Sequence, residues 1–284
     1  MSRRENALRR VRKLGRIARK LALIALSDLA TGDKLRYALR RAGKGGGLFT
    51  YRLRGGVSVA LREGTTDSKV FDEMFVERVY GPCLAALPAS LGRVTLIDLG
   101  ANIGLSVIFL ARALGARNVA VDEIIAVEPD PDNFRLLSEN LQRNGLADCS
   151  TVIRAFAGAE RGFAELHDCG NGAWGMRLGP VSCTGTRVLT LAEIANRAKT
   201  GAPFVLKTDI EGAERQLFLH IRDWEHLIGY IILELHTEFL PVQELFACLA
   251  SSGFAWRIHG ILPAGASIAL LLLERRYRRK QPAR

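Results

Sequence analysis

The chain has 284 residues, 48% of them hydrophobic and 7% aromatic, which is enough apolar surface to bury a core and excludes a wholly disordered protein. Its net charge of +11 arises in residues 1–45, where 14 Lys and Arg accompany 3 Asp and Glu, so the remainder is close to neutral. No apolar run in this sequence approaches the roughly 20 residues of a membrane-spanning helix, which excludes a transmembrane segment within it.

Residues 1–47 are predicted to form a basic, partly helical arm that ends in the glycine-rich linker GKGGG. Apolar side chains recur at helical spacing between the basic ones, at Leu14, Ile17, Leu21 and Ile24. Such a cationic amphipathic helix can lie on an anionic membrane surface, and a basic tract also attracts nucleic acid. A third alternative is a solvated helix packed on its own domain or on a partner subunit. We expect no nucleic-acid partner and keep peripheral membrane contact as an alternative.

The cysteines are five in number and scattered, without the C-x-x-C pair that indicates structural zinc: Cys83, Cys149, Cys169, Cys183 and Cys248. Reduced thiols are therefore expected. The short apolar stretch at residues 21–26 lacks the small-residue cleavage site of a signal peptide. We expect a cytoplasmic location, with or without attachment at the membrane periphery.

The rest of the chain predicts a small lead-in and one α/β domain. Residues 48–92 are the lead-in, with a β-hairpin and a helix within 48–80, and a basic tail at 275–284 follows the main domain at 93–274. Strands are expected at residues 93–99, 123–128, 151–156, 203–210, 229–235, 254–260 and 266–273. Helices are expected at residues 103–114, 131–144, 191–199, 213–221 and 242–252. Continuous apolar strands alternating with helices are typical of a doubly wound α/β sandwich with helices on both faces of a parallel sheet.

The stretch LIDLGANIGLSVIF at residues 96–109 passes abruptly from strand to helix. Gly100 permits the sharp exit from the strand, and Gly104 lets the helix pack closely and a ligand approach. The spacing Asp98-x-Gly100-x-Asn102-x-Gly104 differs from the G-x-G-x-x-G of dinucleotide-binding folds. A carboxylate at this turn suits a cationic amino group better than a pyrophosphate, so the ligand is expected to carry positive charge here.

Glu128 ends the second strand of the domain, in the stretch AVEPD. An acidic side chain at that position can accept hydrogen bonds from both ribose hydroxyls of an adenosine. Pro129 stops the strand, and Asp130 with Pro131 caps and opens the next helix. The glycine turn and Glu128 together indicate a nucleoside-cofactor site.

Five stretches resemble, in order and spacing, the FkbM-type S-adenosylmethionine-dependent methyltransferases over about residues 50–260: LREGTTDSKVFDEMFVERVY, LIDLGANIGLSVIFLA, IIAVEPDPDNFRLLSENL, FVLKTDIEGAE and IILELH. The resemblance implies a seven-stranded, Rossmann-like methyltransferase sandwich with S-adenosylmethionine as donor. It also implies O-methylation of hydroxyls on glycans, glycolipids or secondary metabolites. By this resemblance Asp98, Gly100, Asn102 and Gly104 line the methionine end of the cofactor, and Glu128 holds the ribose.

Methyl transfer to a hydroxyl needs an aligned acceptor oxygen and removal of its proton by a general base or with the help of a metal. The stretch LKTDIEGAE places Lys207 and Asp209 on one face of a strand and Glu211 in the following turn. Asp209 is expected to face the acceptor or the methyl group, with Glu211 close by. The alternative is a structural ion pair of Lys207 and Asp209, with Glu211 and Glu214 complementing the helix N-terminus.

His236 ends the fifth strand on the ligand side, where it serves either as the base or as a supporting hydrogen-bonding group. A metal site of Asp209, Glu211 and His236 is a less favoured alternative, and we predict no metal. Trp174 lies in a glycine-rich loop that either faces the acceptor or acts as a buried lid.

Two other functions stay open at this stage. The basic arm suggests an RNA or protein methyltransferase, although the neutral body and the lack of an Asn-Pro-Pro-Tyr-like tetrapeptide count against it. A non-catalytic binding module that retains the fold is the other, and the presence of both Asp98 and Glu128 counts against that.

Overall fold

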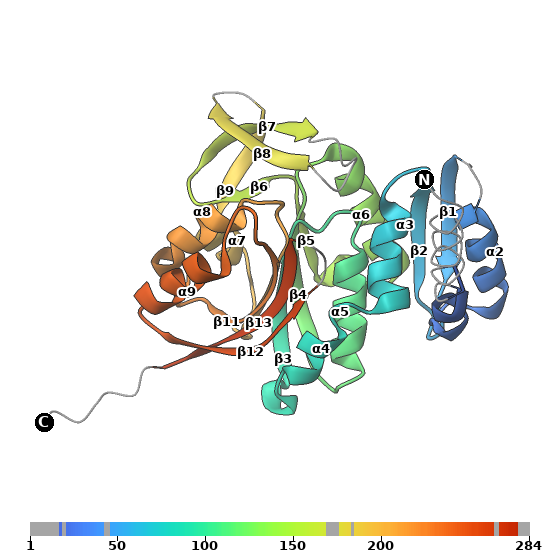
Figure 1. Cartoon of the computed structure of the whole chain (residues 1–284), viewed down its shortest axis with the longest axis horizontal. Coiled ribbons are helices and arrows are strands. Elements are labelled where there is room, and N and C mark those ends of the chain that lie inside the picture. The colour runs from blue at the N-terminus through green and yellow to red at the C-terminus, as the bar shows by residue number, and fades with distance from the viewer. Residues whose placement is uncertain are drawn as a thin grey trace, which may run out of the picture. The chain divides into compact units, whose positions relative to one another are not determined.

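The structure is a computed structural model that divides into two compact units, Met1–Arg78 and Val79–Arg284 (Figure 1). It describes residues 17–18, 21–42, 46–168, 176–182, 185–263 and 267–277. Residues 1–16, 19–20 and 43–45 of the predicted basic arm, the loop around Trp174 and residues 278–284 of the predicted tail lie outside the described residues.

The first unit joins a helix to a β-hairpin. Helix α2 (Thr31–Ala42) precedes strands β1 (Gly47–Arg52) and β2 (Ser58–Glu63), and α3 (Asp67–Phe71) continues into a π-helix at Asp72–Glu77. Tyr37 of α2 is buried against Tyr51 of β1 and Phe71 of α3, with ring centroids 5.2 and 4.8 Å away. Its hydroxyl donates a hydrogen bond of 2.8 Å to Asp72 Oδ1. Helix and hairpin therefore share one aromatic core.

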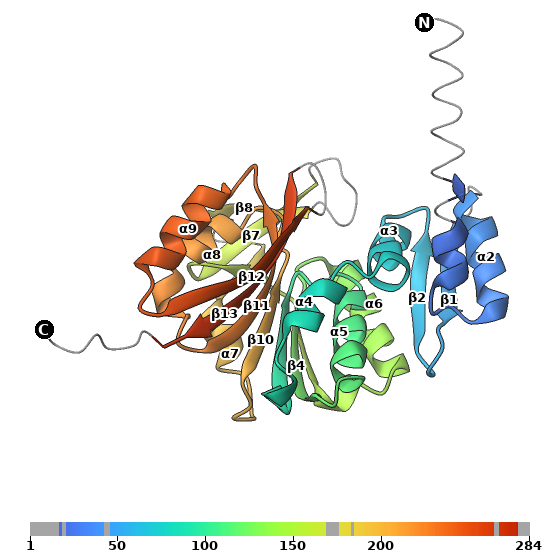
Figure 2. The same cartoon turned by 60° about the horizontal axis from the view of Figure 1, so that its bottom comes forward.

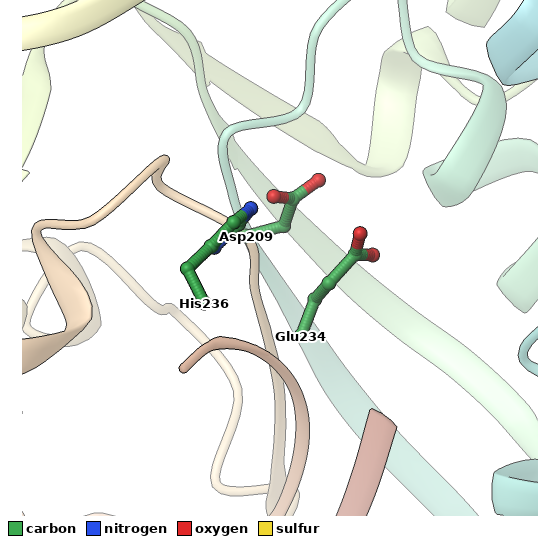
Figure 3. Close-up of side chains that lie close together, drawn as sticks. All are labelled: Asp209, Glu234 and His236. Atoms are coloured by element: carbon green, nitrogen blue, oxygen red, sulfur yellow. The ribbon is translucent and has the colours of Figure 1, made fainter. Parts of the chain in front are cut away.

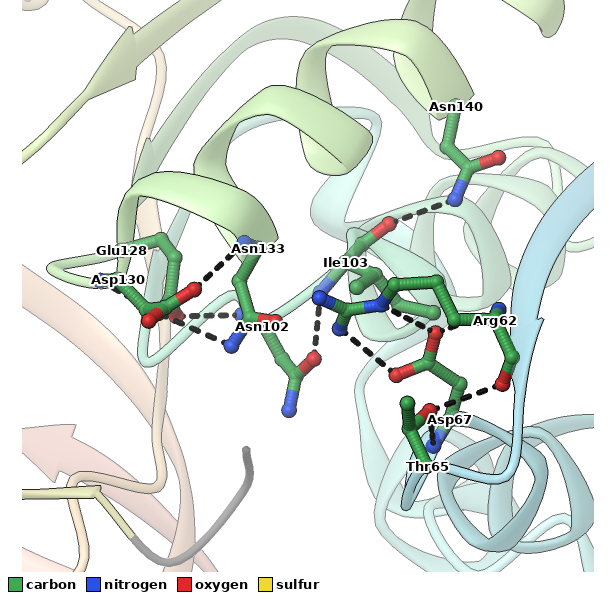
Figure 4. Close-up of polar contacts among 9 residues, drawn as sticks. All are labelled: Arg62, Thr65, Asp67, Asn102, Ile103, Glu128, Asp130, Asn133 and Asn140. Carbon is green, nitrogen blue, oxygen red and sulfur yellow. Dashed lines mark hydrogen bonds and ion pairs between the residues drawn. The ribbon is translucent and has the colours of Figure 1, made fainter. Parts of the chain in front are cut away.

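A buried ion pair fixes the end of the hairpin to α3. Arg62 Nη2 lies 2.9 Å from Oδ1 of Asp67, whose side chain is 1% exposed (Figure 4). Asp67 Oδ2 also accepts hydrogen bonds from the backbone N–H and Nε of Arg62. This contact closes the turn between strand and helix from within the unit.

The second unit is built on a seven-stranded sheet in the order β12-β13-β11-β10-β3-β4-β5. Its strands are β3 (Arg93–Leu99), β4 (Ala120–Val127), β5 (Ser150–Ile153), β10 (Phe204–Thr208), β11 (Ile228–His236), β12 (Ala255–Pro263) and β13 (Ile268–Arg276). The five strands from β11 to β5 are parallel, and β13 runs antiparallel to both β11 and β12. Strands such as β3 are buried along nearly their whole length, as a sheet covered on both faces requires.

Helices cover both faces of this sheet, which confirms the predicted doubly wound α/β sandwich (Figures 1 and 2). One face carries α4 (Gly81–Ala86), α5 (Leu105–Gly115) and α6 (Pro131–Arg143). The other carries α7 (Leu191–Ala195), α8 (Glu214–Leu219) and α9 (Val242–Ser251), whose apolar side chains join those of the strands in one core. Short 3-10 turns lie at Ala89–Leu91, Ala147–Cys149 and Ile221–Asp223. As expected, Asp130 caps α6, its side chain accepting the N–H of Asn133.

A second, four-stranded sheet lies between β5 and α7 in the chain, where no strand was predicted beyond residue 156. It consists of β6 (Phe156–Gly158), β7 (Gly162–Asp168), β8 (Met176–Ser182) and β9 (Thr186–Thr190), in the order β6-β9-β7-β8. The strand expected at 151–156 is therefore wrong at its end, because β5 stops at Ile153 and Phe156 already pairs with β9.

Every helix in the described ranges is too short or too polar to cross a bilayer. Cys83, Cys149 and Cys248 are free thiols, and the side chains of the other two cysteines lie outside the described residues.

Candidate functional site

The turn after β3 is shaped by three residues with left-handed backbone: Gly100, Asn102 and Gly104, with φ of +74°, +49° and +85°. A Cβ on Gly100 would stand 1.9 Å from the carbonyl oxygen of Asp209, and a Cβ on Gly104 would stand 2.7 Å from Leu137. Gly100 is thus required by space as well as by conformation, because the chain after β10 crosses directly over it.

Glu128 ties this turn to the end of β4 (Figure 4). Its Oε2 accepts the backbone N–H of Asn102 at 2.8 Å. Its Oε1 accepts the N–H of Asp130 at 3.0 Å and Nδ2 of Asn133 at 3.3 Å. Burial raises the pKa of Glu128 to about 7, although these hydrogen bonds act to lower it. The residue predicted to hold a ribose is therefore a buried carboxylate close to half ionised at neutral pH.

The acceptor capacity of Glu128 limits what a ligand can add. An ionised carboxylate has about four acceptor positions, and hydrogen bonds from this chain already occupy three of these positions. One position remains, on Oε2, which fits one ligand hydroxyl. Accepting a second hydroxyl requires displacement of Asn133, whose hydrogen bond is the longest of the three.

Asp98 and Lys207 form an ion pair inside the sheet, with side chains 0% and 2% exposed. Lys207 Nζ lies 3.0 Å from Asp98 Oδ1, 3.6 Å from Asp209 Oδ2, and donates to the carbonyl of Gly100 at 3.0 Å. Ser106 Oγ donates to Asp98 Oδ2 at 2.5 Å. Burial would lower the pKa of Lys207, but the charges of Asp98 and Asp209 outweigh burial and raise it. The cation beside Asp98 in this structure is thus an ammonium of the chain itself.

The turn between β10 and α8 is held together by Glu214, which is fully buried. Its Oε1 accepts the N–H of Ile210 at 2.9 Å and bonds His236 Nδ1 at 3.0 Å, while Oε2 accepts the N–H of Gly212 at 2.8 Å. Glu211 has a left-handed φ of +53°, and its Oε2 lies 3.5 Å from His236 Nε2. The motif LKTDIEGAE therefore builds a turn that closes onto His236 from two sides.

His236 is surrounded by negative charge. Burial would lower the pKa of His236, but the hydrogen bond to Glu214 and the charges of Glu214, Asp209 and Glu211 raise it to about 9. The imidazole is therefore protonated at neutral pH in the ligand-free chain, and in that state it cannot accept a proton.

Asp209, Glu234 and His236 come together at the ends of β10 and β11, each with one ligand atom within 4.8 Å of the others (Figure 3). Glu234 also accepts a hydrogen bond of 3.0 Å from the hydroxyl of Tyr80. The sequence analysis gave Glu234 no role, although strand alternation places it on the same face as His236. No sequence signal pairs Tyr80 with Glu234, because 154 positions separate them.

The predicted residues form two groups that are joined by direct contacts. Glu128 holds the turn at Asn102, and the neighbouring Gly100 bonds Lys207, which in turn lies beside Asp209. The structure also brings Asp209, Glu211 and His236 together, with an oxygen of Asp209 within 4.8 Å of a ring nitrogen of His236 and Oε2 of Glu211 3.5 Å from its Nε2. The nucleoside part of a ligand and the group that reacts with it are thus expected to lie side by side, at the ends of neighbouring strands along one edge of the sheet.

Comparison with known proteins assigns a family to this arrangement. The sequence profile of the Methyltransferase FkbM domain matches residues 98–278. No curated protein matches the chain.

Solved structures with similar folds include the methyltransferase FkbM from Methylobacillus flagellatus, with 19% identity over 63% of this chain and 43% of that one, and a TM-score of 0.43. The chain therefore spans less than half the length of that protein. TYW2 of M. jannaschii, in complex with AdoMet, is 11% identical over 81% of this chain and 86% of that one, with a TM-score of 0.44. The O-methyltransferase TomG from Streptomyces achromogenes, in complex with SAM, is 13% identical over 75% and 87%, with a TM-score of 0.43.

Proposed function

Because the chain belongs to the family of methyltransferases with an FkbM domain, we propose that it methylates a hydroxyl oxygen of a glycan, a glycolipid or a secondary metabolite. Its cofactor is S-adenosylmethionine, as the family implies. One observation carries the proposal: the nucleoside-type turn at Glu128 and the acidic cluster at Asp209 are linked through Gly100 and Lys207.

S-adenosylmethionine is proposed to lie across the ends of β3 and β4. The remaining acceptor position of Glu128 accepts a ribose hydroxyl, and a second hydroxyl displaces Asn133. The turn from Gly100 to Gly104 lines the methionine end. Asp98 acts there through its ion pair with Lys207, because its carboxylate has no exposed surface for direct contact with an amine.

The acceptor hydroxyl is proposed to lie against Asp209, Glu211 and His236. Oδ1 of Asp209 is buried without a hydrogen-bonding partner among the described residues, so it can accept the hydrogen bond of an incoming hydroxyl. Methyl transfer from a sulfonium needs this oxygen in line with the departing sulfur. Protonated His236 holds the surrounding carboxylates in place, and the carboxylates of Asp209 and Glu211 are the groups that can take the hydroxyl proton.

Calorimetry with S-adenosylmethionine tests the cofactor site. We expect the wild-type chain to bind, Glu128→Ala to bind at least about tenfold more weakly, which is about 1.4 kcal/mol, and Asp223→Ala, at a 70% exposed side chain, to bind normally. A wild-type chain that binds none would contradict the proposal. Mass spectrometry of glycans and small metabolites from cells with and without the intact chain then identifies the acceptor by the mass of one added CH₂.

The N-terminal unit is proposed to contact an anionic membrane surface. Leu35 and Leu39, one helical turn apart on α2, are 66% and 65% exposed, and Leu26 is 78% exposed. The sequence around them holds the basic excess of residues 1–45. Exposed leucines can insert into the apolar part of a bilayer interface, and the basic side chains beside them can contact its anionic headgroups. Such contact would bring the enzyme to a lipid-linked acceptor.

A further inference from the structure

We propose that Asp209, Glu234 and His236 bind a divalent cation and that the acceptor hydroxyl becomes a further ligand of this cation. The inference rests on the proposed methyl transfer and adds a metal to the same site. It uses Glu234, which the sequence analysis did not assign, in place of Glu211.

The ligand atoms of the three side chains are almost as close together as those around a bound metal ion. They lie at the ends of the neighbouring parallel strands β10 and β11, with ligand atoms within 4.8 Å of one another (Figure 3). Bonds of about 2.1 Å place two ligands of one cation at most about 4.2 Å apart. Small side-chain rotations are therefore enough to close the site around an ion.

A buried oxygen in this cluster lacks a partner. Oδ1 of Asp209 has no hydrogen-bond donor among the residues that the structure describes, although the atom is shielded from water. An unsatisfied buried acceptor costs free energy. A cation held by this carboxylate would remove that cost, so the observation points to a ligand that the chain itself does not supply.

The histidine is oriented as a metal ligand would be. Its Nδ1 is hydrogen bonded to the fully buried Glu214 at 3.0 Å, so Nε2, which lies 3.5 Å from Glu211 Oε2, is the atom that would bind a metal after releasing its proton to solvent. Ligating histidines generally donate their other N–H to a carboxylate or carbonyl, which fixes the ring and its tautomer. Two carboxylates and one imidazole suit Mn²⁺, Mg²⁺ or Zn²⁺, with coordination positions left for water and substrate.

The surrounding charge favours a cation. Two cationic groups, Lys207 and His236, contact or interact with five carboxylates: Asp98, Asp209, Glu211, Glu214 and Glu234. Lys207 is closer to Asp98, at 3.0 Å, than to Asp209, at 3.6 Å. The negative charge of the cluster is therefore only partly neutralised by this chain.

The cation would supply acidity to a poorly acidic alcohol. A hydroxyl oxygen bound to it loses its proton more readily, and the proton passes to Glu211, whose carboxylate is 3.5 Å from His236 Nε2. The oxygen then forms its bond to the methyl carbon as the carbon–sulfur bond breaks, with the electron pair leaving on sulfur. The products are the methyl ether and S-adenosylhomocysteine.

Titration calorimetry of the full chain with Mn²⁺, after treatment with a chelator, tests the site. We expect one Mn²⁺ per chain in the wild type and at least about tenfold weaker binding in Asp209→Asn and Glu234→Gln. Glu238→Gln, at an exposed carboxylate two residues beyond His236, is the matched control and should bind as the wild type does. Circular dichroism confirms that each variant is folded.

A second measurement needs no variant. Electron spin-echo spectroscopy of the Mn²⁺-loaded wild type should show coupling to one imidazole nitrogen, which a surface carboxylate site cannot give. The proposal is overturned if the wild type binds neither Mn²⁺, Mg²⁺ nor Zn²⁺, if the nitrogen coupling is absent, or if folded Asp209→Asn binds Mn²⁺ unchanged. S-adenosylmethionine binding, measured on the same samples, reports separately on the proposed function.

Discussion

The carboxylate of Asp98 and the ammonium of Lys207 are direct neighbours across β3 and β10, 3.0 Å apart and sealed from water. From the sequence, Asp98 was expected to face a cationic amine of the ligand, and an ion pair of Lys207 with Asp209 was only the alternative to an Asp209 that faces the acceptor. In the structure, Lys207 lies between both carboxylates and also bonds Gly100. This lysine is therefore the element that connects the cofactor turn to the acceptor cluster.

Removing one partner of this pair is expected to destabilise the fold strongly. Burial already raises the pKa of Asp98, and Lys207→Met removes the counter-ion that opposes this rise, so the carboxyl must either stay ionised without a partner or take up a proton. Breaking a buried pair in this way costs about 3–5 kcal/mol. Urea denaturation monitored by circular dichroism measures the loss. Arg135→Met is the control, because Arg135 pairs with Glu139 on the surface with 62% of its side chain exposed, and should change stability little. Equal losses in the two variants would contradict a structural role for the buried pair.

Gly100 and Gly115 offer a matched test of the close approach between the two turns. Gly100→Ala places a Cβ 1.9 Å from the carbonyl oxygen of Asp209 at a φ of +74°, so we expect a loss of at least about 2 kcal/mol and weaker cofactor binding. Gly115→Ala, near the end of α5, meets no atom within 4 Å and should stabilise by up to about 1 kcal/mol. Thermal unfolding of both variants checks the prediction, which fails if Gly100→Ala is as stable as the wild type.

The glycine turn shows which structural features could be predicted from the local sequence and which could not. Strand, turn and helix from Arg93 to Gly115 could be predicted because each signal lies within a few residues of the element it shapes. The lack of space for a side chain at Gly100 could not be predicted, because the carbonyl that excludes it belongs to Asp209, more than a hundred positions away.

Contacts between strands that are distant in the sequence were also hard to predict from the sequence alone. The roles of Asp209, Glu211 and His236 remain predictions. The sequence placed these residues at strand ends on the ligand side of the sheet, but it could not give the distances between side chains on separate strands. The ion pair of Asp98 with Lys207 depends on which strands are neighbours in the sheet, and a local sequence pattern does not give the order of the strands. The four-stranded sheet from β6 to β9 was missed because β6 has only three residues and β8 contains Gly179 and Pro180, which disfavour a strand.

Cofactor binding is expected to release a proton from Glu128. The pKa of this carboxyl is about 7 in the ligand-free chain, and hydroxyl donors of a ribose favour the ionised form, so binding lowers that pKa. Affinity for S-adenosylmethionine should therefore rise as pH increases from about 6 to about 8. Calorimetry at pH 7 in buffers of different ionisation enthalpy measures the released proton. A binding constant that does not change with pH, or equal proton release in Glu128→Gln, would contradict this role.

The same carboxyl should make the ligand-free protein less stable at high pH. Its folded pKa of about 7 lies above the ordinary value of 4.5, so the folded state binds the extra proton between these values. The stability that this group contributes is complete below pH 4.5 and is lost as pH rises through about 7. Urea midpoints of wild type and Glu128→Gln should therefore diverge across this range. Parallel pH profiles would show that Glu128 is not the titrating group.

Membrane contact through the N-terminal unit predicts a loss of vesicle binding when its exposed leucines become charged. Leu35→Glu with Leu39→Glu removes two side chains that are 66% and 65% exposed, so the fold should tolerate the change while insertion into the interface is lost. Flotation of the full chain with vesicles that contain phosphatidylglycerol measures binding, and vesicles of phosphatidylcholine alone test the need for anionic headgroups. Leu219→Glu, at a 47% exposed position of the second unit, is the matched control and should float with the wild type. Equal flotation of all three proteins, or none for the wild type, would assign the leucines of α2 to another role.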